Sequence, residues 1–168
     1  GGVLPGAKVT AEIAATRGVR QGEDCISPAK HSAFATPLEL LHFVDHLRQL
    51  SGGKPTGFKL AIGHPWEWFS IAKAMHETNI TPDFIVVDGG EGGTGAAPLE
   101  FINHMGAPLR DGLMLVHNTL VGLSLRDKLK LGCAGEVITA FGLARMLALG
   151  GDWCNSARGF MFSLGCIQ

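Results

Sequence analysis

A glycine-rich segment at residues 88–95 is the first part of the sequence with the composition of a binding site. It contains five glycines together with Asp88, Glu91 and Thr94, and it directly follows the apolar run 84–87. Such a run predicts a buried parallel strand, and α/β proteins bind ligands where parallel strands end. An ordinary flexible connection is the competing interpretation, but the glycines and the two carboxylates favour a functional loop.

Lys59 is the second candidate, because it lies in the middle of a predicted strand at residues 57–63. Its neighbours on the same face are Ala61 and Gly63, so the lysine stem has room to reach a ligand. An ammonium group is costly to bury alone, and we therefore expect Lys59 to be paired or functional. The alternative is an edge strand on which Lys59 points into solvent.

The loops after the last two predicted strands complete the candidate site. One loop holds Gly135 and Glu136, and the other holds Ser156, Ala157 and Arg158. Barrels of alternating strands and helices commonly bind phosphate in their last two such loops, through backbone N–H groups. Ser156 offers a hydroxyl and Arg158 offers a cation, although a surface salt bridge explains Arg158 equally well.

The elements that must position these residues alternate along the chain. A helix begins with Thr36, Pro37 and Glu39, which have the spacing of a capping box. The alternation predicts an α/β fold with a parallel sheet and right-handed crossovers. Two architectures remain open, a small doubly wound sheet and part of a (β/α)₈ barrel. The predicted strands are 57–63, 84–87, 129–133 and 152–155, and the predicted helices are 10–17, 36–51, one from about 65, 108–126, 139–149 and 157–165.

The overall composition indicates which binding partners to exclude and which cellular compartment to expect. The 168 residues carry 14 basic and 15 acidic side chains, a net charge of −1, which argues against nucleic acid or an anionic membrane as the main partner. No apolar run approaches the length of a membrane span, and no secretion signal is visible, so we expect a cytoplasmic protein. Cys133 and Cys154 stand among apolar residues and are predicted to be reduced core residues.

Five segments in order along the chain resemble the FMN-binding synthase domain of the glutamate synthase family. The match rests on residues 1–10, Ile26-Ser27-Pro28 with His31, Phe58-Lys59-Leu60, residues 91–98 and Leu164-Gly165-Cys166. The resemblance implies a partial (β/α)₈ TIM barrel of about four βα units, with residues 1–168 as a fragment of the barrel domain. Residues 1–35 would form a substrate-side loop segment, and residues 36–168 would form the βα units.

The resemblance also implies the cofactors and the reaction. Members of the family carry FMN and a three-iron cluster (3Fe-4S), and they reduce 2-iminoglutarate, formed from 2-oxoglutarate and ammonia, to L-glutamate. Their electron donor is ferredoxin or an NAD(P)H-linked subunit. By position, Lys59 would lie beside the flavin ring and act in catalysis, and Cys166 would be the first of three cluster ligands. The implied FMN-binding residues are Lys59, Asp88, Gly93, Thr94, Gly135, Glu136, Ser156, Ala157 and Arg158, and the implied substrate-side residues are Lys8, Ser27 and His31.

The sequence departs from the family pattern in three ways, and these departures change what we expect of the chain alone. The sequence stops at Gln168 before the second and third cluster cysteines, and the first barrel strands would precede Gly1. Val3 stands in place of a glutamine, and Ala134-Gly135-Glu136 in place of Asp-Gly-Gly, which fits a divergent branch of the family. We therefore expect an internal fragment that is inactive alone, binds FMN poorly and pairs with other copies through its open sheet edges.

Three other functions remain open from the sequence. The enzyme could join a different amine to glutamate, as an N-methylglutamate synthase does. The chain could be a non-catalytic barrel module. A flavin-free phosphate-binding barrel, such as an aldolase or isomerase, is the third alternative.

Overall fold

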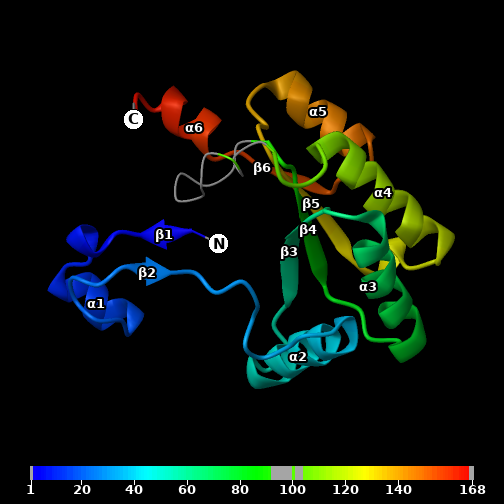
Figure 1. Ribbon diagram of the computed structural model, residues 1–168. Helices are drawn as coiled ribbons and strands as arrows, with labels where there is room; N and C mark the ends of the chain where they lie inside the picture. The colour runs from blue at the N-terminus through cyan, green and yellow to red at the C-terminus, as the bar shows by residue number, and fades with distance from the viewer. Residues whose placement is uncertain (1, 92–99, 101–103, 167–168) are drawn as a thin grey trace.

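The computed structural model describes residues 2–91, 100 and 104–166, and it contains two sheets of different size (Figure 1). The strands β1 (Val3–Leu4) and β2 (Cys25–Ile26) pair antiparallel, and between them lie the 3₁₀ turn η1 (Gly6–Lys8) and helix α1 (Ala11–Arg17). Figure 1 shows this small unit on the opposite side of the larger sheet from α3 and α4. Sequence periodicity predicts α1 but not the two short strands.

The larger sheet is parallel and has four strands in the order β3-β4-β5-β6. Each strand follows its neighbour in the sequence, and its register pairs Lys59 with Val86 and Val86 with Gly132. This sequential order is the one expected for part of a barrel, whereas a doubly wound sheet reverses its order once. The four strands form an open sheet. Their bounds are β3 (Gly57–Ala61), β4 (Phe84–Asp88), β5 (Lys130–Ala134) and β6 (Trp153–Asn155).

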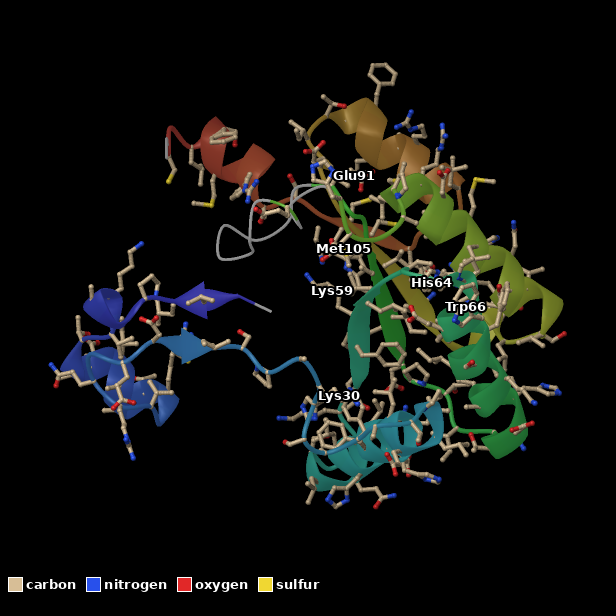
Figure 2. The ribbon with its side chains drawn as sticks, viewed as in Figure 1. Lys30, Lys59, His64, Trp66, Glu91 and Met105 are labelled. Carbon is tan, nitrogen blue, oxygen red and sulfur yellow. The ribbon has the colours of Figure 1, made fainter. Side chains whose placement is uncertain are left out.

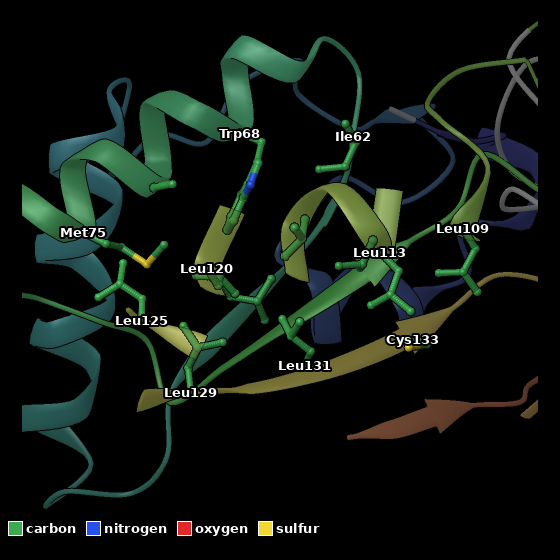
Figure 3. Close-up of a cluster of buried hydrophobic side chains, with 14 of the residues drawn as sticks. Ile62, Trp68, Met75, Leu109, Leu113, Leu120, Leu125, Leu129, Leu131 and Cys133 are labelled. Atoms are coloured by element: carbon green, nitrogen blue, oxygen red, sulfur yellow. The ribbon is translucent and has the colours of Figure 1, made fainter. Parts of the chain in front are cut away.

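Helices connect the strands and pack mainly on one face of the sheet. Trp68, Leu113 and Met146, from three successive helices, share one buried cluster with Ile85 and Leu131 of the strands. Figure 3 shows Trp68, Leu113 and Leu131 in this cluster. Burial of this cluster supplies the main stabilisation of the unit, because each fully buried side chain of this size contributes about 1.5–3 kcal/mol. The helices are α2 (Pro37–Leu50), α3 (Pro65–Thr78), α4 (Leu109–Gly122), α5 (Ala140–Ala148) and α6 (Arg158–Ser163), and the 3₁₀ turn η2 (Arg126–Lys128) precedes β5.

The predicted elements are present, and the differences lie at their ends. The capping box at Thr36 and Glu39 is formed, and Thr139 caps α5 as predicted. The predicted strand 57–63 ends at Ala61 instead. The predicted helix 108–126 is wrong beyond Gly122, because the chain turns there and Ser124 adopts a φ of 56°. Apolar periodicity continues across that turn, so it could not mark the end of the helix.

The other face of the sheet carries the alternate residues of each strand. On β4 these are Phe84, Val86 and Asp88, and on β3 Lys59 shares that face. Phe84 and Trp153 meet edge to face there, with ring centroids 6.1 Å apart. A cavity of about 390 Å³ at the amino end of the strands is lined by Pro55, Asp83, Phe84, Lys130 and Trp153.

An arginine and an aspartate fix the amino ends of β3 and β4, and we call this pair the Arg48–Asp83 clamp. Asp83 Oδ2 accepts hydrogen bonds from the backbone N–H of Thr56 at 2.7 Å and from Arg48 Nε at 3.0 Å. Arg48 Nη2 also donates to the carbonyl of Thr81 at 2.7 Å. Burial alone would raise the pKa of Asp83, but the Thr56 N–H and the Arg48 guanidinium outweigh it and lower that pKa.

The Arg126–Asp152 clamp repeats the same arrangement at the amino ends of β5 and β6. Asp152 Oδ2 accepts from the backbone N–H of Leu131 at 2.7 Å and from Arg126 Nη2 at 2.9 Å. Arg126 Nη2 donates as well to the carbonyl of Gly150 at 2.7 Å. Burial opposes ionisation here too, but the Leu131 N–H and the charge of Arg126 lower the pKa of Asp152.

None of the helices within residues 2–91 and 104–166 is long and apolar enough to cross a membrane.

Candidate functional site

Lys59 and Asp88 form an ion pair on the face of the sheet that lies opposite the helix-packed core. Lys59 Nζ lies 2.8 Å from Asp88 Oδ2, and the two side chains are 57% and 32% exposed. Asp88 is the last residue of β4, so the pair lies toward the carboxyl end of the strands. β3 is an edge strand of the described sheet, yet Lys59 has a charged partner and is not simply solvated. Figure 2 shows Lys59 projecting from β3 away from α3.

Backbone hydrogen bonds join the loops that follow β3, β4 and β5. The N–H of Ala107 donates to the carbonyl of Ile62 at 2.7 Å, and the N–H of Gly90 donates to the carbonyl of Ala107 at 2.9 Å. The N–H of Gly89 donates to the carbonyl of Ala134, the last residue of β5, at 2.7 Å. These bonds bring the first residues of the predicted glycine loop against both neighbouring loops. Gly93 and Thr94 lie outside the described residues.

Glu91 joins the loop after β4 to the start of α4. Both of its carboxylate oxygens lie 3.0 Å from the backbone nitrogen of Leu109, the first residue of α4, and accept its hydrogen bond. Figure 2 shows Glu91 and Met105 at the same end of the sheet as Lys59. The sequence interpretation counted Glu91 as a loop carboxylate and assigned it no contact. No local sequence pattern marks this bond, because 18 positions separate Glu91 from Leu109.

The turn after β5 has an unusual backbone. Gly135 has a φ of 135° and Glu136 a φ of 45°. A Cβ at Gly135 would lie 3.1 Å from the nitrogen of Gly89 and 3.4 Å from Glu91 Oε2, so a larger residue would have to push the two loops apart. Such strained turns concentrate at functional sites. Glu136 itself is exposed.

The three predicted residues after β6 are exposed and open the last helix. Ser156 and Ala157 follow Asn155, the end of β6, and Arg158 is the first residue of α6. Their position follows from the parallel sheet, because β6 ends at the same edge as β4 and β5. The structure therefore places the β4, β5 and β6 loops on one edge, as the sequence predicts.

The predicted substrate-side residues lie before the large sheet. Lys8 ends η1 in the small unit and is exposed. The backbone N–H of Ser27 donates to the carbonyl of Gly2 at 2.9 Å, just beyond β2. His31 stacks on Phe34 with ring centroids 4.5 Å apart. Lys8 and Ser27 therefore belong to the small unit, and no contact in the described part of the chain joins either of them to Lys59.

His31 also borders a cavity that the sequence did not indicate. Its volume is about 450 Å³, and it lies between the segment before α2 and the first turns of α3. Trp66 stacks on His64 at its rim, with ring centroids 4.1 Å apart. The lining residues come from segments about 35 positions apart, so only the packing of α2 against α3 brings them together. They include Lys30, His31, Phe34, Trp66, Glu67 and Ser70.

Cys133 lies in the core and the partly buried Cys154 packs against it, whereas Cys25 lies in β2 and Cys166 near the chain end. Cys133 is fully buried, and burial, with Cys154 beside it, raises the pKa of its thiol to about 12. Burial also raises the pKa of Cys154. Both thiols stay protonated near neutral pH, as expected for core residues. Cys166 is partly buried, and within residues 2–91, 100 and 104–166 no three His, Cys, Asp or Glu side chains gather as metal ligands.

The described residues suit a phosphorylated flavin but do not hold an iron–sulfur cluster. Lys59 offers a cation on an open face whose neighbouring positions Ala61 and Ala134 are small. The turn at Gly135 packs closely on Gly89 and has a φ of 135°, a backbone conformation that favours glycine. Cys166 by contrast supplies one thiolate, and one thiolate cannot hold such a cluster.

These features define an α/β protein with its candidate site at the carboxyl ends of parallel strands. The family model described as "Conserved region in glutamate synthase" matches all of residues 1–168. The chain therefore belongs to the glutamate synthase family.

Three relatives show the range of this similarity. The glutamate synthase large subunit-like protein YerD of Bacillus subtilis is 42% identical over 168 residues, which are 100% of this chain and 32% of that protein. The archaeal glutamate synthase (NADPH) of Methanocaldococcus jannaschii is 35% identical over 167 residues, covering 99% of this chain and 32% of the relative. The ferredoxin-dependent glutamate synthase of Antithamnion sp. is 34% identical over 172 residues, which cover 100% of this chain and 11% of that protein. The chain thus spans about a third of the length of the first two relatives.

Proposed function

We propose that this chain is the flavin-binding part of a glutamate synthase-type oxidoreductase. The observation that carries the proposal is the Lys59–Asp88 ion pair, 2.8 Å long, on the open face of the sheet toward its carboxyl end. When bound, FMN would supply the hydride that reduces 2-iminoglutarate, formed from 2-oxoglutarate and ammonia, to L-glutamate. The family match over the whole chain supports this assignment.

Different residues would bind the ring and the phosphate of FMN. Lys59 would place its ammonium beside the flavin ring, where a cation stabilises negative charge, and Asp88 would orient that ammonium. The turn at Gly135 and Glu136 would hold the phosphate together with Ser156, Ala157 and Arg158. Gly93 and Thr94 complete the proposed set from the glycine loop.

Lys8, Ser27 and His31 would bind the substrate from the segment before the sheet. A lysine suits the carboxylates of 2-oxoglutarate, because it donates charge-assisted hydrogen bonds. This assigns residues 1–35 to the substrate side and residues 36–168 to the βα units. Their separation from Lys59 in the structure means that a substrate would have to lie between the small unit and the open face of the sheet.

We further propose that a barrel, a metal centre and a redox partner complete the protein. Additional strands would close the four described strands into a barrel, and further cysteines would join Cys166 around an iron–sulfur cluster. The names of the relatives mention NADPH and ferredoxin, so either a nicotinamide-linked subunit or ferredoxin is the proposed electron donor. β3 and β6 present the edges of the described sheet, which favours an oligomer if no further strand covers them.

The decisive experiment is an absorbance spectrum and a product assay on the intact protein. Purified protein should show flavin absorbance and release FMN on denaturation. With 2-oxoglutarate, a reductant and ammonia it should form L-glutamate, and methylamine in place of ammonia serves as the comparison. Protein without flavin would overturn the proposal, whereas N-methylglutamate as the main product would keep the flavin site and change the amine.

A further inference from the structure

Helix α4 takes its amino-terminal cap from outside itself. Its N-cap residue is Pro108, which makes no side-chain capping bond, and the first helical residue is Leu109. The backbone N–H of Leu109 donates instead to both carboxylate oxygens of Glu91, 18 positions earlier, at 3.0 Å. The positive end of the helix dipole favours a carboxylate at this place.

The two preceding helices are capped differently. Glu39 lies within α2 and accepts from the N–H groups of Ala35 and Thr36 at 2.7 and 3.1 Å. Glu67 lies within α3 and accepts from the N–H of His64 at 3.1 Å. In both helices the capping carboxylate belongs to the helix that it caps. At α4, by contrast, the capping bond joins the first helical residue to Glu91 in the loop after β4.

The Glu91 carboxylate also lies against the turn after β5. Gly89 has no space for a Cβ, because that atom would overlap Glu91 Oε2 and would lie 2.8 Å from Leu109 Cβ. A Cβ at Gly135 would lie 3.4 Å from the same oxygen. The carboxylate therefore fills the space that the two glycines leave. Its removal would take away the bond to α4 and the packing against Gly135, and would leave the β4 loop held by the Gly89–Ala134 and Gly90–Ala107 backbone bonds.

We propose that Glu91 is a positioning residue that holds the turn at Gly135 in the geometry required to bind the phosphate of the flavin. The inference rests on the proposed function, because it takes the ligand of that turn to be FMN. Glu91 does not touch the ligand. It acts by tying the loop after β4 to α4 through the Leu109 N–H, a bond that requires an acceptor of full glutamate length, and by placing its carboxylate against Gly135 in the loop after β5.

Three variants of the intact protein test this role by FMN affinity, measured from quenching of FMN fluorescence on adding apoprotein. Glu91→Ala removes the acceptor and should raise the dissociation constant about tenfold or more. Glu91→Asp keeps the charge but shortens the side chain, so it should show a similar loss. Glu91→Gln keeps an acceptor oxygen at the same distance and should stay within about threefold of wild type.

Glu39→Ala is the matched control, because it removes a glutamate cap whose hydrogen bonds are to Ala35 and Thr36 at the start of α2. It should leave FMN affinity within about threefold of wild type. Amide hydrogen exchange adds a readout that needs no flavin: Leu109 N–H should lose protection in Glu91→Ala and Glu91→Asp and keep it in Glu91→Gln.

The outcomes separate the inference from the function on which it rests. If wild-type protein binds no FMN, the proposed function fails and the inference fails with it. If wild type binds FMN and both Glu91→Ala and Glu91→Asp bind it equally well, only the inference is overturned. Equal losses in Glu91→Ala and Glu39→Ala would also overturn it, since they would reduce Glu91 to an ordinary helix cap.

Discussion

The two ends of the parallel sheet are built from different interactions. At the amino end, the Arg48–Asp83 and Arg126–Asp152 clamps tie strands, turns and backbone N–H groups through charged side chains. At the carboxyl end, backbone hydrogen bonds of glycine-containing loops and the Glu91 cap make the connections. The four charged side chains of the clamps are engaged in these contacts. Lys59 is paired with Asp88 as well, but its side chain is 57% exposed, so a ligand can reach it.

This difference indicates that the amino end of the sheet serves stability and the carboxyl end serves chemistry. In barrels of alternating strands and helices, residues at the carboxyl ends of the strands serve catalysis, and residues at the amino ends serve stability. The two repeated clamps fit the second role, because each satisfies a backbone N–H at the start of a strand. Substitutions at the two ends should therefore separate loss of activity from loss of folding.

The largest effect should follow replacement of Lys59. Lys59→Ala in the intact protein removes the proposed cation beside the flavin and should lower kcat/KM about 100-fold. Unfolding by urea should change little, because the Lys59–Asp88 pair is partly exposed. Lys59→Arg, which keeps the charge, is the control and should retain more activity than Lys59→Ala. Unchanged turnover in Lys59→Ala would support a non-catalytic module.

Arg126→Ala tests the opposite end and should cost about 2 kcal/mol of unfolding free energy, because it removes the side-chain donor of two carbonyls and one of the donors to Asp152. Urea unfolding measures this loss. Turnover per folded molecule should stay at the wild-type level. Lys130→Ala is the matched control, since Lys130 lies 3.7 Å from the same aspartate but is 72% exposed. A large drop in turnover for Arg126→Ala would contradict the division between the two ends.

Gly135→Ala should produce a smaller loss of stability at the carboxyl end. Its φ of 135° is unfavourable for alanine, and the new Cβ would lie 3.1 Å from Gly89 N, so we expect a cost of about 1 kcal/mol in unfolding free energy. FMN affinity, measured by fluorescence quenching, should fall as well. Gly122→Ala has no atom within 4 Å of its Cβ and should be neutral or slightly stabilising. Equal behaviour of the two variants would argue against a constrained turn.

The smallest expected effect is a loss of unfolding free energy at acidic pH, caused by protonation of the aspartates in the two clamps. The pKa of Asp83 and of Asp152 is lowered in the folded protein, so each stabilises it above the ordinary carboxyl pKa and loses that contribution as the pH falls through the folded value. Urea unfolding between about pH 5 and pH 3 should show declining stability. Asp152→Asn should flatten that decline while lowering stability near neutral pH. A pH dependence identical to wild type would contradict the assignment.

Local patterns predicted most of the fold. The capping box at Thr36, the apolar run of β4 and the alternation of elements each depend on neighbouring residues, so the sequence shows them directly. The small β1–β2 sheet was missed because two-residue strands leave no periodicity. The end of α4 was missed because apolar spacing continues past the turn at Ser124.

The candidate site was predicted only where a single element specifies it. Lys59 stood out because its own strand face is small, but its partner Asp88 could not be derived, since the pairing depends on the register between β3 and β4. Glu91 and Leu109 are 18 positions apart in the sequence, with most of the glycine loop between them, so no local pattern marks their hydrogen bond. The cavity beside His31 likewise requires α2 and α3 to pack.

The Arg48–Asp83 clamp has a consequence at a distance from its own atoms. By holding Thr56 against Asp83, it sets which residue of β4 stands beside each residue of β3. Lys59 follows three positions later, about 10 Å along the strand at roughly 3.3 Å per residue. A slip of one position would turn alternate side chains to the wrong face. The clamp therefore fixes the register of β3 against β4 at the amino end of the sheet. This register allows Lys59 and Asp88 to form their ion pair toward the carboxyl end.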